Sequence, residues 1–360
     1  MILILTAPDD VHADAAEVEL GRRGATWVRF DPADVPSRAS LSVTVRDGRL
    51  TRTLIRHPDP ADADRRATTD RRAATDRGTS AGRGATAGPA TSAGRVVDLD
   101  AVTAVWFRRP GVPVAPAHLD EPHAGFVVEE SRQFVGDVWE TLDVPALPAA
   151  RPVVLRAQQK VRQLQLALRL GFDVPATAVG NEPGAVLDLF DHTGGRLITK
   201  QVGLSSLGGD LMRYTEPVSH RDIGHVDGVR HCPLIAQARV PKRIELRVTV
   251  VGDRVFTAAI DSQRSNHARH DWRRQDDRNT PLSRYDLPAD VAARCVALTR
   301  ALGLRYGALD LIVTPDGRYV YLEINPSGQY LWVEEETGLP ITAAVVDLLT
   351  APTPTTGAST

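Results

Sequence analysis

Two carboxylates and an amide near the end of the sequence have the types and spacing that divalent-metal chemistry needs. Asp310 lies in one apolar run, and Glu323 and Asn325 lie in the next. The Pro-Asp-Gly sequence at 315–317 predicts a turn between the runs, so the two form a hairpin that brings Asp310 beside Glu323 and Asn325. Because side chains alternate along a strand, Glu323 and Asn325 share one face.

Carboxylate and amide oxygens are hard ligands of the kind that Mg²⁺ prefers, and such a site leaves positions for water and nucleotide phosphates. Without a metal, the two carboxylates would repel one another and would be costly to bury in apolar strands. The sequence therefore predicts a magnesium site formed by Asp310, Glu323 and Asn325.

Lysine is rare in this sequence, which carries its positive charge almost entirely on arginine; the three lysines are Lys160, Lys200 and Lys242. Lys160 begins a segment with the apolar periodicity of a helix, and Lys200 ends a short β-branched strand. The glycine- and serine-rich residues 203–209 follow Lys200 and predict a loop whose backbone N–H groups can close over phosphates. We interpret both lysines as phosphate contacts; a solvated helix charge is the alternative for Lys160.

A third group of charged residues follows an apolar strand at 234–240. The next run alternates with period two, so Glu245 and Arg247 project from the same face. An acidic and a basic group side by side suit a nucleotide's hydroxyls and phosphates, whereas the alternative is an exposed cross-strand ion pair.

The elements that must position these residues begin with a βαβ pattern. Residues 1–5 and 27–30 are predicted strands, with a helix from about Val11 to Leu20 between them that ends at Gly21 or Gly24. A hairpin is predicted at 41–55 around Asp47 and Gly48. Residues 59–95 are rich in Ala, Thr, Arg, Asp and Gly and predict a disordered insertion.

Order is expected to return with a strand at 102–107, which ends in Arg108 and Arg109. We favour a structural role for these arginines at the sheet edge over a reach into a cleft. An amphipathic helix should follow, with its apolar residues on related faces: Phe126, Phe134, Val135, Val138 and Leu142. The proline-rich stretch 145–152 predicts a hinge between domains.

Composition narrows the class of protein. The 360 residues are 42% apolar, enough for a sizeable core, and the net charge of −2 gives no electrostatic footprint for nucleic acid. Cys232 and Cys295 match no metal or redox spacing. The apolar residues 1–5 are too short for a signal peptide or membrane span, so a cytoplasmic protein without a membrane partner is expected.

These elements, in this order, resemble the ATP-grasp superfamily, with the Asp310 to Glu323 spacing and the Glu-x-Asn-Pro ending as the most specific features. The resemblance implies an α/β (α+β) fold with an N-terminal βαβ pre-ATP-grasp domain. The expected divisions are a pre-ATP-grasp domain at 1–150, a central ATP-grasp subdomain at 151–235, a C-terminal ATP-grasp subdomain at 236–350 and a tail at 351–360.

Within the superfamily, the chain looks most like the microviridin or graspetide type of ribosomal-peptide maturases. The residues that carry this likeness are 105–110, the helix at Lys160, 245–252, 271–273 and 322–329.

This resemblance implies ATP and Mg²⁺ as cofactors and assigns roles by position. Lys160 and Lys200 would contact phosphates, Glu245 the ribose, and Arg247 the transferring phosphoryl group or acyl phosphate. Three further residues would form the nucleotide hinge: Gln237, Arg239 and Val240. Many superfamily members have an acidic residue at the hinge, whereas this chain has Gln237 and Ala238.

The resemblance also implies a substrate contact at 271–273. Asp271 and Arg273 would face the substrate, with Arg273 as a bidentate partner for its carboxylate. The alternative is a charged surface loop, because residues 264–278 are polar throughout.

The implied activity is ATP-dependent, ADP-forming ligation of a carboxylate to a hydroxyl or amine. Its substrate would be a precursor peptide with a leader and a core that supplies Ser, Thr or Lys together with Asp or Glu, and related enzymes make a homodimer plausible. Two alternatives remain: a ligase that adds an amino acid to a peptide or small acid, and a non-catalytic ATP-binding regulatory protein.

Overall fold

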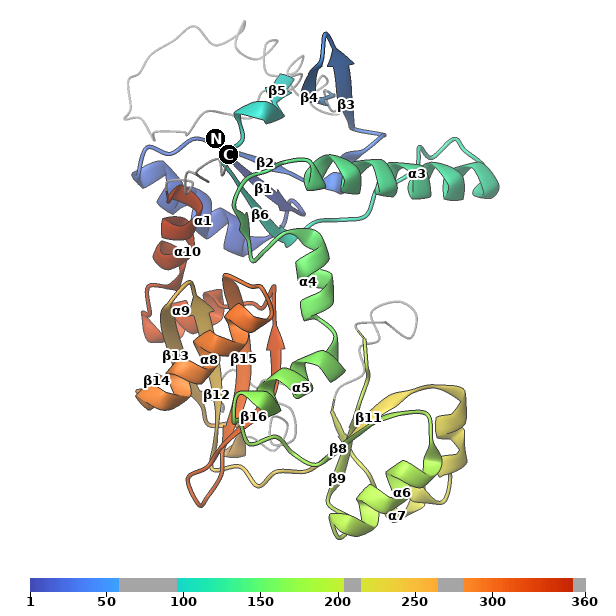
Figure 1. Ribbon diagram of the computed structural model, residues 1–360, viewed down its shortest axis with the longest axis vertical. Helices are drawn as coiled ribbons and strands as arrows, with labels where there is room; N and C mark the ends of the chain where they lie inside the picture. Colours follow the sequence, from blue (N-terminus) through green and yellow to red (C-terminus); the bar gives the residue numbers. More distant parts are fainter. Residues whose placement is uncertain (58–95, 204–214, 265–280, 352–360) are drawn as a thin grey trace, which may run out of the picture. The chain divides into compact units, whose positions relative to one another are not determined.

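The computed structural model describes residues 1–57, 96–203, 215–264 and 281–351, which pack into two units (Figure 1). The first comprises Met1–Ala150 with the chain from Leu349 onward, and the second comprises Arg151–Leu348. The predicted insertion at 59–95 lies outside the described residues. Among the described helices, none is both long enough and apolar enough to cross a membrane.

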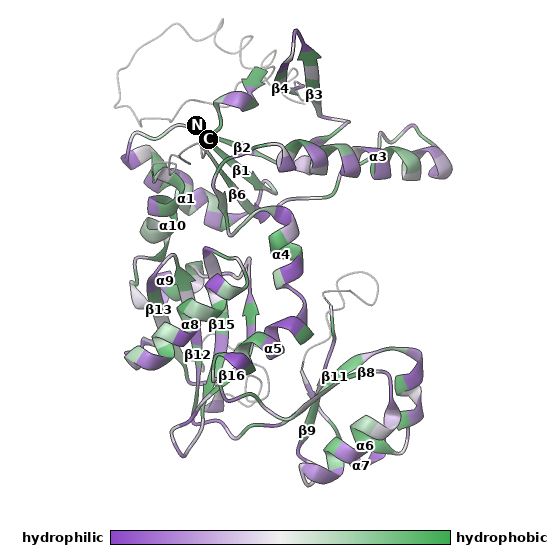
Figure 2. Cartoon of the chain, in the orientation of Figure 1, coloured by the Kyte–Doolittle hydropathy of each residue, from purple (hydrophilic) through white to green (hydrophobic). Residues whose placement is uncertain are grey.

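The first unit is built on a parallel sheet with the strand order β2-β1-β6-β7. Every residue of β1 is buried, as a strand covered on both faces requires, and Figure 2 shows β1 and β6 as predominantly hydrophobic. These elements have the bounds β1 Ile2–Thr6, α1 Val11–Arg22, β2 Trp27–Phe30, β6 Ala104–Arg109 and β7 Ala146–Leu147. The predicted βαβ opening is therefore confirmed, whereas β6 continues two residues further than expected and includes both arginines.

A small antiparallel sheet in the same unit pairs β3 (Ala39–Arg46) with β4 (Arg49–Arg56) and β5 (Val96–Asp98). Asp47 and Gly48 form the two-residue turn with φ of 50° and 71°. Positive φ at both positions is what a tight hairpin turn needs, and Asp-Gly meets this requirement cheaply. The predicted hairpin is confirmed.

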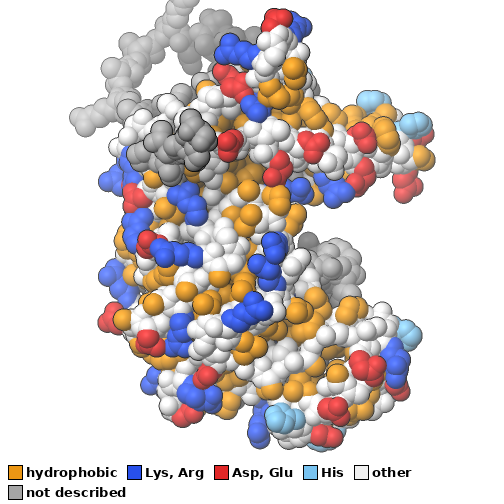
Figure 3. Space-filling model, viewed as in Figure 1, with side chains coloured by type: hydrophobic (Ala, Val, Ile, Leu, Met, Phe, Trp, Pro, Cys, Tyr) orange, Lys and Arg blue, Asp and Glu red, His pale blue; other side chains and the backbone are white. Residues whose placement is uncertain are grey.

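The helix α3 (Glu121–Glu140) forms where the sequence predicts an amphipathic helix, but two of the apolar residues assigned to related faces are exposed. Val135 and Val138 are buried against the sheet, but Phe126 is 67% exposed and Phe134 is also exposed. Hydrophobic side chains are visible on the surface of α3 in Figure 3. Phe126 and Phe134 point away from the face that packs, so not all the apolar residues of this segment belong to one buried stripe.

The second unit begins with α4 (Arg151–Ala157) and α5 (Lys160–Arg169), followed by a four-stranded sheet ordered β10-β9-β11-β8. The strands are antiparallel where paired, and one apolar cluster packs α6 against the sheet through Val186, Phe190 and Leu197. The elements are β8 Thr177–Gly180, α6 Pro183–His192, β9 Leu197–Lys200, β10 Glu216–Pro217, α7 His220–Ile223 and β11 Leu234–Ala238. β11 ends two residues earlier than predicted, so Arg239 and Val240 lie in the connection that follows it.

A five-stranded antiparallel sheet with the order β14-β13-β12-β15-β16 completes the second unit. Its central strands, β12 and β15, are almost wholly buried. The elements are β12 Ile244–Val251, β13 Arg254–Ile260, β14 Leu282–Arg284, α8 Ala289–Ala301, β15 Tyr306–Val313, β16 Tyr319–Asn325, α9 Leu331–Thr337 and α10 Ile341–Thr350. The mixed α/β fold expected from the sequence is confirmed.

Short 3₁₀ turns complete the described elements. They are Pro32–Asp34, Leu99–Ala101, Val226–His231 and Ser262–Arg264. The last of these follows β13 and brings Ser262 to the end of the five-stranded sheet that carries the predicted site residues.

Candidate active site

A pocket of about 430 Å³ opens in the second unit between its two sheets. One wall comes from β9, β11 and the connection after β11, and the other comes from β12, β15 and β16. Most residues singled out from the sequence and described by the structure line this pocket: Lys200, Gln237, Arg239, Val240, Glu245, Asp310 and Glu323.

Asp310 and Glu323 lie directly opposite one another on β15 and β16, as the sequence predicts. The hairpin is not regular, however. Leu311 pairs with Tyr321 and Asp310 pairs with Glu323, so Leu322 is an extra residue that forms a β-bulge. In a regular ladder, Leu322 would face Asp310 and Glu323 would turn to the opposite side of the sheet. The bulge thus places both carboxylates on the pocket face.

Each carboxylate has a cation beside it. Arg247 on β12 donates from Nη1 to Oδ1 of Asp310 at 2.9 Å, and both side chains are buried. Lys160, at the start of α5, donates from Nζ to Oε2 of Glu323 at 2.7 Å. Negative and positive charge therefore alternate across the end of the pocket, an arrangement suited to a ligand that is both anionic and metal-bound.

Glu245 and Arg247 share one face of β12, as predicted, but Glu245 is no exposed ion pair. Its side chain is buried, and Oε1 accepts from Lys242 Nζ at 3.0 Å and from Ser262 Oγ at 2.6 Å. Burial raises the pKa of Glu245, although the charge of Lys242 and the hydroxyl of Ser262 oppose this. The scarcity of lysine pointed to Lys242, whereas nothing in the sequence pointed to Ser262.

The residues predicted to form the nucleotide hinge, Gln237, Arg239 and Val240, include no acidic side chain. Gln237 is buried, and its Oε1 accepts from Lys200 Nζ at 2.9 Å while its Nε2 donates to Thr177 Oγ1 at 3.0 Å. The amide thus orients the ammonium group of Lys200, which also lines the pocket. Ala238 and Val240 complete this wall with small and apolar surface.

Asn325 lies on β16 two residues beyond Glu323, but it is exposed, and it does not line the pocket. Its Oδ1 accepts from the backbone N–H of Ser327 at 3.0 Å. Its role as a metal ligand remains a prediction. Asp271 and Arg273 lie outside the described residues, as do residues 204–209 of the glycine-rich loop.

The donors at the end of the pocket fit a magnesium ion. Asp310 and Glu323 present hard oxygens from neighbouring strands on one face, and the nearby Lys200 and Arg247 suit the phosphates of a nucleotide that would share the metal. Asp310 and Glu323 are two carboxylates, and in the described parts of the chain no group of three or more His, Cys, Asp or Glu residues could hold a metal.

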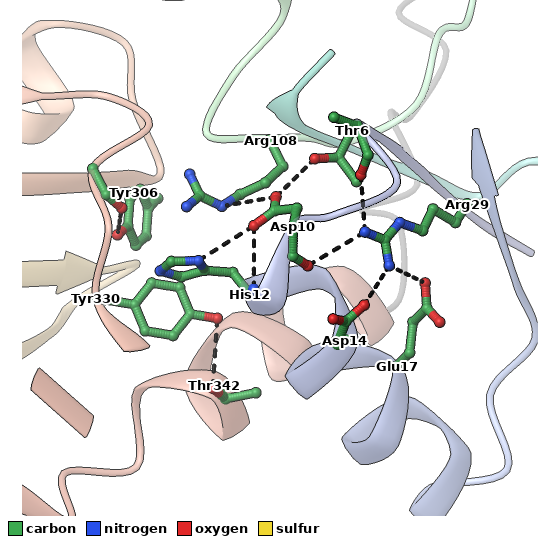
Figure 4. Close-up of polar contacts among 12 residues, drawn as sticks. Thr6, Asp10, His12, Asp14, Glu17, Arg29, Arg108, Tyr306, Tyr330 and Thr342 are labelled. Atoms are coloured by element: carbon green, nitrogen blue, oxygen red, sulfur yellow. Dashed lines mark hydrogen bonds and ion pairs between the residues drawn. The ribbon is translucent and has the colours of Figure 1, made fainter. Parts of the chain in front are cut away.

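The first unit carries a separate buried polar cluster where β1 and β6 end (Figure 4). Asp10 caps α1, accepts from Thr6 Oγ1 at 2.7 Å and lies 3.4 Å from Arg108 Nε. Burial alone would raise the pKa of Asp10, but its bonds with His12, the charge of Arg108 and the Thr6 hydroxyl together hold it well below its usual range. Arg108 is therefore buried in a structural cluster at the end of β6, a strand paired on both sides, whereas Arg109 is exposed.

His12 in this cluster is 4% exposed, and its Nδ1 lies 3.3 Å from Asp10 Oδ1. Burial lowers the pKa of His12, and the neighbouring Asp10 only partly opposes the effect. The neutral imidazole is thus favoured at neutral pH.

No protein-family model matches the sequence. Among solved structures, the chain is similar to macrocyclase MdnC bound with precursor peptide MdnA from Microcystis aeruginosa MRC, with 28% identity and a TM-score of 0.77 over 97% of this chain and 98% of that one. It is also similar to a RiPP-associated ATP-grasp ligase from Chryseobacterium gregarium in complex with ADP and a leader and core peptide. That likeness has 27% identity and a TM-score of 0.80 over 98% of this chain and 97% of that one.

Among curated proteins, a probable alpha-L-glutamate ligase of Pectobacterium carotovorum is 26% identical over 198 residues, which are 54% of this chain and 64% of that relative. The chain thus spans less than two thirds of that relative's length. The likeness in fold extends over nearly the whole chain, and the likeness in sequence to the glutamate ligase covers about half of it.

Proposed function

We propose that this chain, an ATP-grasp ligase, activates Asp and Glu side-chain carboxylates of a ribosomal precursor peptide and closes them into side-chain rings. The observation that carries the proposal is the end of the pocket, where Asp310 and Glu323 face one another with Arg247 and Lys160 beside them. Carboxylates that can hold a metal and cationic side chains that offset phosphate charge are groups that enzymes use for phosphoryl transfer from ATP.

In the pocket, Glu245 accepts hydrogen bonds from the ribose hydroxyls, and the hinge at Gln237 to Val240 contacts the adenine. Lys200, held by the Gln237 amide, contacts the phosphates. Asp310 and Glu323, with Asn325 as a further candidate ligand, would hold Mg²⁺, which would neutralise charge at the triphosphate.

The first step forms an acyl phosphate. An oxygen of the peptide carboxylate attacks the γ-phosphorus of ATP, the bond from that phosphorus to the β,γ-bridging oxygen breaks, and ADP leaves. Arg247 is placed to offset the charge on the transferring group, because its guanidinium is held by two hydrogen bonds, to Asp310 Oδ1 at 2.9 Å and to the Gln329 carbonyl at 3.0 Å.

In the second step, a Ser or Thr hydroxyl or a Lys amine of the same peptide attacks the acyl carbon. An ester or amide bond forms, the bond to phosphate breaks, and inorganic phosphate leaves with the carboxyl oxygen. The proton of the nucleophile is released as the bond forms, so each ring removes one water from the peptide. The two groups are already tethered, which raises their effective concentration.

A peptide substrate is favoured over a free amino acid by the extent of the likenesses. The chain matches the macrocyclase and the RiPP-associated ligase over almost their full lengths, but the glutamate ligase over only part of its length. Both of those neighbours were solved with peptides. Residues Asp271 and Arg273 remain the predicted contacts for the substrate.

The test is intact mass spectrometry after incubation with ATP, Mg²⁺, a mixture of free amino acids and a neighbouring-gene peptide rich in Thr or Ser and Asp or Glu. Loss of one water per ring is expected. A gain of one amino-acid residue mass would instead favour the amino-acid-adding ligase, and an unchanged mass with every such peptide would contradict ring closure on a precursor peptide.

Two variants assign the reaction to this pocket. Glu323→Gln should abolish product, because it removes one of the two facing carboxylates. Glu335→Gln makes the same change at an exposed position of α9 and should leave the yield unchanged. Equal yields from both variants and the wild type would point away from this site.

A further inference from the structure

The turn after β16 packs its backbone against Arg247 and leaves no room for a side chain at Gly328. We infer that Gly328 is a positioning residue that sets the place of the Arg247 guanidinium, and that the turn 326–330 controls the rate of phosphoryl transfer through it. The inference rests on the proposed function, in which Arg247 acts on the transferring group.

Hydrogen bonds tie this turn to the strands beneath it. Arg247 Nη2 donates to the carbonyl of Gln329 at 3.0 Å, and Tyr306 Oη donates to the carbonyl of Gly328 at 2.6 Å. Tyr306 is buried and packs against Tyr330, with their ring centroids 6.1 Å apart. The carbonyls of Gly328 and Gln329 are therefore both held by hydrogen bonds from strand residues, the second one by the Arg247 guanidinium itself.

The contact is too close for a Cβ atom. A methyl group at Gly328 would lie 2.4 Å from Ala308 Cβ and 2.7 Å from Arg247 Nη2. Ala308 cannot withdraw, because it belongs to β15, which is paired on both sides, and it is completely buried. The turn or the guanidinium must move instead.

Either movement affects the site. If the turn lifts, the Gln329 carbonyl leaves Arg247 Nη2, and the guanidinium loses the hydrogen bond that complements its bond to Asp310. If the guanidinium moves, the bond to Asp310 is distorted as well. In both cases the guanidinium of Arg247 no longer keeps its hydrogen bonds to both Asp310 and Gln329, so its orientation is less well fixed.

The experiment compares Gly328→Ala with Gly228→Ala, a position where a Cβ would meet nothing within 4 Å and where φ is not positive. For the wild type and both variants, kcat and KM for ATP are measured by water loss from the peptide, and the melting temperature is recorded. We expect Gly328→Ala to lower kcat at least about tenfold, since displacement of a positioned group by about 1 Å costs on the order of a hundredfold. KM for ATP should change less than about threefold, because the hinge and Lys200 are untouched.

A second change separates sterics from general damage. Ala308→Gly, made in the Gly328→Ala background, removes the 2.4 Å contact and should recover part of kcat, whereas Ala308→Gly alone should not raise it. Recovery in the double variant supports positioning. A loss in melting temperature with unchanged kcat would show a structural role only and would overturn the inference, as would Gly328→Ala activity equal to that of the wild type.

Crystal structures of the wild type and Gly328→Ala provide a readout that needs no peptide. Displacement of the Arg247 guanidinium from Asp310 Oδ1 and the Gln329 carbonyl in the variant is expected, and an unmoved guanidinium would overturn the inference. If the wild type modifies no peptide, the proposed function fails, and this structural comparison still decides the place of Gly328.

Discussion

Replacement of Gln163 by Met should destabilise the second unit, because its buried amide bonds both backbone groups of Ile324 on the outer edge of the five-stranded sheet. β16 is the last strand of that sheet, and its outer row of backbone groups bonds to segments outside the sheet; the Tyr321 N–H, for example, donates to the Asp173 carbonyl at 2.8 Å. Gln163, on α5 and 1% exposed, donates from Nε2 to the Ile324 carbonyl at 2.9 Å and to the Ala157 carbonyl at 2.7 Å. Its Oε1 accepts from the Ile324 N–H at 3.3 Å.

Methionine has a similar length and can fill the space, so little packing is lost. Two carbonyls and one N–H of the backbone lose this partner, and so does the buried Tyr321 hydroxyl, which donates to Gln163 Oε1 at 3.4 Å. At about 1 kcal/mol for each hydrogen bond and more where a group stays dry, the change should cost about 2–4 kcal/mol. For a unit of this size that corresponds to a fall in melting temperature of roughly 5–15 °C.

The assay is thermal and urea unfolding of Gln163→Met beside Gln165→Met, which makes the same change at an exposed position of the same helix. The control should stay within about 0.5 kcal/mol of the wild type. Lys160 lies one helical turn before Gln163 and donates to Glu323, next to Ile324, so Gln163→Met should also weaken ATP binding. A Gln163→Met protein as stable as the Gln165→Met protein would refute the role of the amide at this edge of the sheet.

Three further predictions concern charged residues. Asp10→Asn should lower the free energy of unfolding by about 3 kcal/mol at pH 7, the scale for breaking a buried ion pair. Because folding lowers the pKa of Asp10, this deficit should shrink as pH falls below 3.8. A constant deficit in acid unfolding experiments would contradict the prediction. Because burial raises the pKa of Glu245, the wild type loses stability as pH rises from 4.5 through that raised pKa. The stability of Glu245→Gln relative to the wild type should therefore increase over this range. Urea unfolding at a series of pH values measures the difference. Lys200→Met should weaken binding of a non-hydrolysable ATP analogue at least about tenfold, the scale of one charge-assisted hydrogen bond, and unchanged affinity by calorimetry would remove Lys200 from the phosphate site.

The sequence was most informative where strand periodicity and turn chemistry act locally. The Asp47-Gly48 hairpin, the α5 helix that begins at Lys160 and the pairing of Asp310 with Glu323 follow from such signals. The pairing nevertheless depends on a bulge at Leu322, which no alternation pattern announces, because it is set by how β16 packs against β15.

Contacts between segments far apart in sequence were not predictable in the same way. Ser262 reaches Glu245 from the turn after β13, and Gln163 reaches Ile324 from another element. A polar side chain gives no hint of its distant partner until the fold brings the two together. The burial of an apolar side chain was not always predictable either, since Phe126 belongs to an amphipathic helix and does not face the core.

The β-bulge at Leu322 also divides the C-terminal hairpin into a part near the carboxylates where insertions would shift the register and a tip where they would not. A bulge pins the register of the strands that flank it, so the placement of the carboxylates is held from within the ladder and not from the Pro315–Gly317 turn at its far end. That turn is exposed from Pro315 to Gly317, and an insertion there should keep Gly317, because its φ of 86° strains any other residue. The tip is therefore a place where an affinity tag or a spectroscopic probe can be inserted to follow the enzyme at work, with the chemistry left in register.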